Sequence, residues 1–290
     1  MSNEKSYAGD FTPSDWAWAA KKVKELYEKI HETDALTIFF KKVLFSARSG
    51  THGLPASGCW LFGEAGSGKT TALKECRRLL SQDVNLDSGT PSILLTLLPS
   101  PTMHTIVRGL LAQLKYPFAH ARTFGERAEL LFDVLRKKQV RVIFIDEIQH
   151  VVEGNRNANR VEIRDFFKRL LDETNCCLVL SGLPSARKLR EQDQQLATRV
   201  PGEVLLTINF SKPEGREFIA ALLRLGPIPF AESASEKIQD VFSMRDAASA
   251  RLVAQVIEEA TKVAALMRSQ TVLDAHIFHA FRLTLLGGTR

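Results

Sequence analysis

The segment from Gly63 to Thr70 combines residue types, at a fixed spacing, that can hold a nucleoside triphosphate. It reads Gly-Glu-Ala-Gly-Ser-Gly-Lys-Thr and follows the short apolar run from Cys59 to Phe62. Three glycines let the backbone wrap a triphosphate closely, so that successive N–H groups and the start of the next helix face its negative oxygens. In this pattern the lysine reaches the β- and γ-phosphates and the threonine binds Mg²⁺. We therefore predict that Thr70 binds Mg²⁺ and that ATP is bound by Gly63, Glu64, Ala65, Gly66, Ser67, Gly68, Lys69, Thr70 and Thr71.

A second segment, Val142 to Glu147, ends an apolar run of β-branched and aromatic residues in two carboxylates. Such a run is typical of a buried strand, and ligands of open α/β sheets bind at the carboxyl ends of the strands. Asp146 is predicted to hold Mg²⁺ through water beside Thr70, and Glu147 to polarise the attacking water. Two acids that merely leave a strand are the alternative, but acids placed downstream of a phosphate loop favour ATP hydrolysis.

Other groupings that could do chemistry are weaker. The cysteines Cys59, Cys76, Cys176 and Cys177 lack the paired spacing of metal ligands, which favours reduced thiols in the core. His276 and His279 have helical spacing, but without further ligands nearby they indicate a helix face rather than a metal site.

Composition is typical of a globular ATPase rather than of a membrane or disordered protein. The chain has 290 residues, of which 44% are hydrophobic and 25% charged, and a formal net charge of +6. This length suits one α/β core with an accessory helical part. Its apolar runs are too short for a membrane helix and its first residues lack the apolar stretch of a signal peptide, so we expect a cytoplasmic location. The basic charge is compatible with an anionic polymer as partner.

The elements that must position these residues follow from periodicity and turn signals. Two helices are expected before the phosphate loop, and four after residue 212. Between them, strands alternate with helices, which indicates a parallel sheet covered on both faces. The expected strands are 59–62, 92–97, 142–145, 177–181 and 204–208; the expected helices are 12–30, 33–47, 71–80, 101–116, 124–138, 161–173, 214–225, 233–242, 245–267 and 272–285. We predict an N-terminal helical segment packing on the core (1–57), an α/β core (58–211) and a helical lid (212–290).

A five-stranded parallel core followed by a small helical lid resembles the AAA+ P-loop ATPases. In that layout Ser181 would end the strand between the phosphate-binding and acid-bearing strands, where a small polar residue orients water or senses the γ-phosphate. A serine that merely closes a strand before Gly182 is an equal alternative. Arg199 stands where AAA+ proteins place an arginine that reaches the nucleotide of a neighbouring subunit, with Arg187 and Arg190 as competitors.

The lid would contribute a further arginine. Arg251, near the start of a long helix, stands where AAA+ proteins often place a nucleotide-sensing arginine. Arg245 is a second candidate, and a surface salt bridge is the alternative for both.

Three stretches together resemble the AAA+ transposition regulators of the TniB and TnsC type. They are Val140 to Val151, Leu178 to Gly182 and Asp193 to Arg199, of which the spacing from Ser181 to Arg199 is the most discriminating. The resemblance implies a bacterial ATPase that forms a ring or helical filament on double-stranded DNA, with ATP between subunits. It also implies recruitment of a transposase and of a target-selection protein of the TniQ type.

The same resemblance implies DNA contacts at His104 and Arg108 and at a loop holding Arg122 and Thr123. Such contacts reach phosphates rather than bases, so binding should tolerate any sequence and weaken with salt. Ordinary solvated side chains are the alternative reading of these residues.

Two other functions remain open at this point. A replication initiator or helicase loader is expected to add a DNA-reading helical domain, whereas only Gly287 to Arg290 follow Leu286. A signalling ATPase that acts as a nucleotide switch without DNA is expected to carry effector repeats, and the sequence shows no internal repeat.

Overall fold

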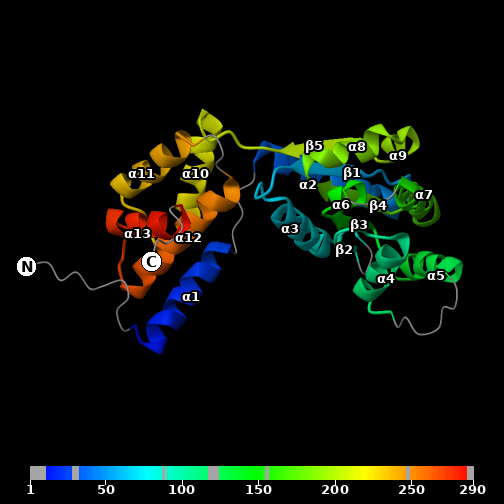
Figure 1. Ribbon diagram of the computed structural model, residues 1–290. Coiled ribbons are helices and arrows are strands. Elements are labelled where there is room, and N and C mark those ends of the chain that lie inside the picture. Colours follow the sequence, from blue (N-terminus) through cyan, green and yellow to red (C-terminus); the bar gives the residue numbers. More distant parts are fainter. Residues whose placement is uncertain are drawn as a thin grey trace, which may run out of the picture. The chain divides into compact units, whose positions relative to one another are not determined.

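The chain folds into two compact units (Figure 1). The computed structural model describes residues 11–27, 33–86, 89, 91–116, 124–153, 157–245 and 249–285. Unit 1 comprises Met1–Thr33 with Ile208–Arg290, and unit 2 comprises Asp34–Thr207.

Unit 2 is built on a five-stranded parallel sheet. Its strands are β1 (Cys59–Gly63), β2 (Ser92–Thr96), β3 (Val142–Asp146), β4 (Cys177–Gly182) and β5 (Gly202–Leu206), in the order β2-β3-β4-β1-β5. β4 therefore lies between the strand that precedes the phosphate loop and the strand that ends in Asp146, as the sequence predicted.

Helices cover both faces of this sheet because successive side chains of each strand point to opposite sides. Cys59 and Leu61 pack with α2 (Asp34–Thr51) and α3 (Lys69–Gln82). Trp60 and Phe62 pack in the cluster on the other face, and the Trp60 indole donates to the Val200 carbonyl at 3.0 Å. That face is covered by α4 (Met103–Gln113), α5 (Phe124–Lys137), α6 (Gln149–Val152), α7 (Asn157–Thr174), η1 (Pro184–Ala186), α8 (Arg187–Glu191) and α9 (Gln194–Arg199).

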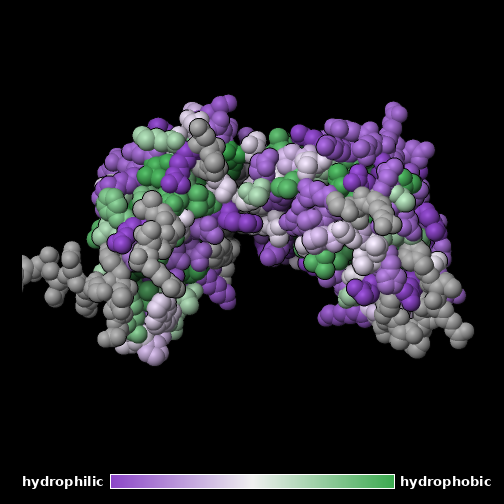
Figure 2. All heavy atoms as spheres, viewed as in Figure 1, coloured by the Kyte–Doolittle hydropathy of each residue, from purple (hydrophilic) through white to green (hydrophobic). Residues whose placement is uncertain are grey.

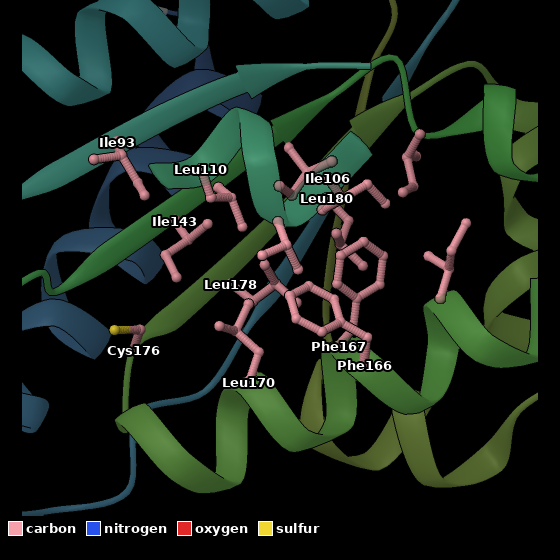
Figure 3. Close-up of a cluster of buried hydrophobic side chains, with 14 of the residues drawn as sticks. Ile93, Ile106, Leu110, Ile143, Phe166, Phe167, Leu170, Cys176, Leu178 and Leu180 are labelled. Carbon is pink, nitrogen blue, oxygen red and sulfur yellow. The ribbon is translucent and has the colours of Figure 1, made fainter. Parts of the chain in front are cut away.

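Figure 3 shows part of the core on this second face. Ile143 and Leu178 from neighbouring strands meet Leu110 of α4 and Phe167 of α7, and all four side chains are fully buried. Burial of a side chain of this size contributes about 1.5–3 kcal/mol. The core therefore holds the carboxyl ends of β3 and β4 in fixed register, with Ile145 opposite Leu180.

Unit 1 is helical. It contains α1 (Pro13–Tyr27), α10 (Pro213–Leu225), α11 (Glu232–Ser243), α12 (Ala250–Leu266) and α13 (Asp274–Thr284), with one isolated bridge between Phe230 and Val272. Its core gathers apolar side chains such as Ile219, Phe242 and Val256.

The expected division at residues 57 and 211 differs from the two units. The predicted N-terminal segment is shared between them: α2 packs on the sheet, whereas α1 buries Ala19 in the core of unit 1. Arg268, just after α12, also donates to the Asp15 carboxylate of α1 at 3.0 Å. The cause is the apolar face of α1, which α12 covers, so that α1 joins the lid helices rather than the sheet.

Two helix starts also differ from expectation. The helix expected from Arg245 begins at Ala250, because the Ser249 side chain accepts a hydrogen bond from the Leu252 N–H at 3.2 Å and caps it there. The helix expected from Val161 begins at Asn157. Among the described residues, every helix is too short or too polar to cross a lipid bilayer.

Candidate nucleotide site

The loop after β1 has the backbone shape that a phosphate-binding loop requires. Gly66 and Gly68 have φ angles of 79° and 95°, in the left-handed region that disfavours side chains. A Cβ at Gly63 would lie 2.3 Å from Ser67 Oγ and 2.7 Å from the Leu206 carbonyl oxygen. Glycine is therefore needed at all three positions.

Lys69 is the first residue of α3 and its ammonium group lies against this loop. Its Nζ donates to the carbonyl oxygens of Gly63 at 2.7 Å and Glu64 at 2.9 Å, and the residue is only 7% exposed. The ammonium is thus kept at the mouth of the loop, close to where a phosphate would bind.

Two features of the loop fit a bound anion. The buried hydroxyl of Ser67 has no hydrogen-bond partner among the described residues. The N-cap of α3 is Gly68, which has no side chain with which to accept from the first N–H groups of the helix. Unsatisfied N–H groups at a helix start attract negative oxygens, so the loop suits a triphosphate.

Asp146 is the point where three segments meet. Its Oδ2 accepts from the Thr70 hydroxyl at 2.8 Å, and its Oδ1 accepts from the Ser181 hydroxyl at 2.9 Å and from the Glu147 N–H at 3.0 Å. Asp146 is 1% exposed and Ser181 is fully buried. The structure thus brings together the predicted residues of the phosphate loop, of the acidic strand and of β4.

The oxygens of Thr70 and Asp146 suit Mg²⁺. This ion prefers oxygen ligands and is usually held by one or two protein carboxylates together with phosphates and waters. The described part of the chain holds no cluster of three histidine, cysteine or acidic residues that could bind a metal by itself.

Glu147 has an unusual backbone. Its φ is 60°, whereas four of the other described non-glycine residues with positive φ follow the ends of helices: Lys115, Gln139, Asn175 and Arg268. A non-glycine residue in this region costs about 1–3 kcal/mol, and such strain gathers at functional sites. Its carboxylate accepts a hydrogen bond from the Gln149 side-chain amide. We did not predict a role for Gln149 from the sequence. The amide side chain in the run Ile148 to Val151, directly after the two acids, could have indicated one.

Arg199 ends α9 and is bound within its own chain. Its Nε and Nη2 donate to the two oxygens of Asp172 on α7, each at 2.9 Å. This hydrogen-bonded pair holds the pKa of the Asp172 carboxyl below its usual range. The pair is solvent-accessible, with side-chain exposures of 35% and 56%. The surface over α8 and α9 is largely hydrophilic (Figure 2). The sequence did not indicate Asp172, because an acid on a polar helix face carries no distinguishing pattern.

The competing arginines have a different partner. Arg187 and Arg190 both bind the Glu203 carboxylate of β5, Arg187 at 3.0 and 2.7 Å and Arg190 at 2.6 Å. The Arg187 guanidinium also lies over the Phe62 ring. Arg187 and Arg190 thus share one carboxylate of the sheet, whereas Arg199 binds an acid of α7.

The remaining predicted residues are not brought to this site by the described contacts. Arg251 is exposed at the second position of α12, and Arg245 precedes that helix; both belong to unit 1, whereas the phosphate loop belongs to unit 2. His104 and Arg108 are exposed on α4, where His104 Nε2 contacts Arg127 Nη1 at 2.5 Å. Arg122 and Thr123 lie outside the described residues.

The four cysteines are buried and free, as expected. Burial raises the pKa of Cys176 to about 11 and of Cys59 and Cys177 to about 12, and it also raises that of Cys76. They serve as core side chains and take no part in the site.

Comparison with solved structures shows which fold this is. The Orc1 protein of Aeropyrum pernix, solved in complex with DNA, has a TM-score of 0.61 at 16% identity, over 85% of this chain and 63% of that one. Cdc6p of Pyrobaculum aerophilum has a TM-score of 0.64 at 14% identity, over 91% and 72%. The RuvB branch migration motor of Thermotoga maritima has a TM-score of 0.52 at 15% identity, over 87% and 69%.

These likenesses show the AAA+ P-loop ATPase fold and, at such identities, the fold alone. The chain spans just under two thirds of the length of the Orc1 structure. No curated protein matches the sequence. The family described as bacterial TniB protein matches residues 51–210, a stretch that includes the phosphate loop, Asp146, Ser181 and Arg199. Since this match covers more than half of the chain, the protein belongs to the TniB family.

Proposed function

We propose that this protein is an ATP-dependent regulator of DNA transposition that assembles on double-stranded DNA with ATP at its subunit interfaces. The observation that carries the proposal is the convergence of Lys69, Thr70, Asp146 and Ser181 at one edge of the sheet. Membership in the TniB family and the net charge of +6 support the link to transposition and to DNA.

The residues divide the chemistry of hydrolysis among them. Lys69 and the N–H groups of the loop would bind the phosphates. Thr70 and Asp146 would hold Mg²⁺, which would neutralise the negative charge that develops on the phosphate oxygens. Glu147 accepts the proton of the attacking water. Ser181, bonded to the same carboxylate as Thr70, orients the site toward the γ-phosphate. Arg199 of one subunit stabilises charge in the site of its neighbour.

Substitutions test the nucleotide site. Lys69→Ala should abolish ATP binding, because the phosphates lose their main cation, and Glu147→Gln should keep binding but stop hydrolysis. Lys74→Ala, an exposed lysine on the same helix, is the matched control and should behave as wild type. Fluorescent-nucleotide binding and phosphate release are the measurements. ATP binding that survives in Lys69→Ala would contradict the assignment.

Electron microscopy with duplex DNA of several lengths tests the assembly. In the presence of ATP or a non-hydrolysable analogue, we expect oligomers whose length follows the DNA and which dissolve as salt rises, since phosphate contacts release counterions. A monomer under all of these conditions would overturn the filament. The transposition role predicts ATP-dependent stimulation of a transposase encoded beside this gene, and no stimulation would leave only a DNA-binding ATPase.

A replication initiator is the second candidate. The likeness to Orc1 and Cdc6p favours it, but that likeness is one of fold, and RuvB shares the fold as well. The family match therefore supports the transposition regulator over the initiator.

A further inference from the structure

Gln149 is a buried amide that joins two strand ends beside the nucleotide site. It is 3% exposed and begins α6, two residues after Glu147. Its Oε1 accepts from the Leu183 N–H at 3.1 Å, and its Nε2 donates to the Glu147 carboxylate. Because a backbone N–H can only donate, the amide oxygen must face Leu183, and the NH₂ group therefore faces Glu147.

The end of β4 is shaped to admit this amide. A Cβ at Gly182 would lie 2.6 Å from Gln149 Oε1 and 2.8 Å from Ile148 Cγ2. The Ile148 N–H also donates to the Ser181 carbonyl at 2.9 Å. Two hydrogen bonds thus tie the segment after β3 to the end of β4, and one of them passes through Gln149.

Glu147 depends on this support. Its backbone has a φ of 60°, so the ordinary direction of a strand side chain does not orient its carboxylate. The amide of Gln149 is the hydrogen-bond donor that the structure shows on that carboxylate. A base on a flexible side chain acts well only when it is held in hydrogen-bond reach of the proton that it takes.

We propose that Gln149 is the positioning residue of Glu147 and links that base to the end of β4 that carries Ser181. The proposal rests on the function proposed above, in which Glu147 takes a proton from water. Gln149 acts through Glu147 and not on ATP, so its loss lowers kcat and leaves ATP affinity in place.

A purely structural role makes a different prediction. If Gln149 only satisfied the Leu183 N–H, its substitution would lower the stability of the fold but leave the kcat of the folded protein unchanged. Two variants separate the readings: Gln149→Glu replaces only the NH₂ group that faces Glu147, and Gln149→Leu removes both hydrogen bonds. Gln255→Leu, at an exposed glutamine of α12, is the matched control for the leucine substitution.

The experiment measures ATP affinity, kcat and the pH profile of hydrolysis for the full chain with duplex DNA present. For Gln149→Leu we expect ATP affinity within about threefold of wild type. We expect kcat to fall at least tenfold but by no more than the roughly 10²–10⁴-fold that a positioned base contributes in full. For Gln149→Glu we expect the acid limb of the profile to move to higher pH, because two facing carboxylates retain a proton between them. Raising the pH should then restore part of the activity in Gln149→Glu but none in Gln149→Leu.

The outcomes separate this inference from the proposed function. If wild type hydrolyses ATP and Glu147→Gln does not, a wild-type kcat and pH profile in Gln149→Glu overturns the positioning role. A wild-type kcat in Gln149→Leu overturns it as well, whereas loss of folding in that variant leaves Gln149→Glu to decide. If wild type itself has no turnover, or Glu147→Gln retains it, the proposed function fails instead.

Discussion

The Asp146 carboxylate receives three hydrogen bonds, from Thr70, Ser181 and the Glu147 N–H. An acid that is 1% exposed needs such partners, because an unpaired buried carboxylate is costly. The same bonds aim Thr70 and Ser181 at one point beside the phosphate loop. At the scale of residues, the stability of the buried acid and the geometry of the proposed Mg²⁺ site therefore have one cause.

The close fit at Gly182 gives a prediction of stability. Gly182→Ala should destabilise unit 2 by about 1–3 kcal/mol, since the added methyl would lie 2.6 Å from Gln149 Oε1. Gly125→Ala, on α5 with nothing within 4 Å of the added methyl, is the control and should be neutral or stabilising by up to about 1 kcal/mol. Urea unfolding measures both. Equal stability of the two variants would show that the end of β4 has more room than the structure gives it.

The site residues divide by the kind of signal they leave in a sequence. Lys69, Thr70 and Asp146 were predictable because phosphate chemistry fixes their types and their places after strands. Gln149 and Asp172 were not, because an amide and a surface acid act through partners that only the folded chain brings close. The positive φ of Glu147 was likewise invisible, since no residue type encodes it.

Side-chain hydrogen bonds cap the starts of several helices, and one of these caps can titrate. The Leu273 N–H at the start of α13 donates to Nδ1 of His276 at 3.0 Å, a bond that requires neutral imidazole. His276 is 4% exposed, and its burial, with a contribution from the nearby His279, lowers its pKa below the ordinary value of 6.5.

This cap predicts how stability depends on pH. Because the folded-state pKa of His276 is the lower one, its contribution is complete above pH 6.5 and is lost as the pH falls through the folded value. We expect unit 1 to melt at a lower temperature at pH 5.5 than at pH 7.5. His276→Gln keeps a capping acceptor that does not titrate, so the melting difference should shrink. An unchanged difference in circular-dichroism melting curves would exclude His276 as a source.

The strands were easier to predict than the helix ends. Each strand is a short apolar run bounded by turn signals, and all five were found within two residues of their expected bounds, with β4 between β1 and β3 as expected. Helix ends depend on single hydrogen bonds such as that of Ser249, which moved the start of α12 to Ala250. The short elements α6, η1 and α8 are too brief for a periodic pattern to predict.

At the scale of the molecule, the chain forms two units, and unit 1 combines segments from both ends of the sequence. The sequence predicted a sheet core and helical lid but assigned α1 to the core. An amphipathic helix shows which of its faces is apolar, not which partner covers it; Ala19 is covered by the lid helices.

In the proposed assembly the nucleotide site is shared between neighbouring subunits, and Arg199 is the residue on which this sharing depends. Within its own chain Arg199 is held by Asp172. To bind the nucleotide of a neighbouring subunit, its guanidinium must leave the Asp172 carboxylate and bind a phosphate instead. A surface ion pair contributes only about 0–1 kcal/mol of stability. Contacts formed on subunit assembly can offset the loss of this pair.

Mixing two inactive variants tests whether neighbouring subunits share the nucleotide site. Arg199→Ala retains its own Glu147, and Glu147→Gln retains its own Arg199, so neither should hydrolyse ATP alone. When they are mixed on duplex DNA, some interfaces combine an intact Glu147 with an intact Arg199, so phosphate release should reappear and should be greatest near equal amounts of the two variants. No activity at any ratio, with both variants assembled on DNA, would contradict a site completed by the neighbouring subunit.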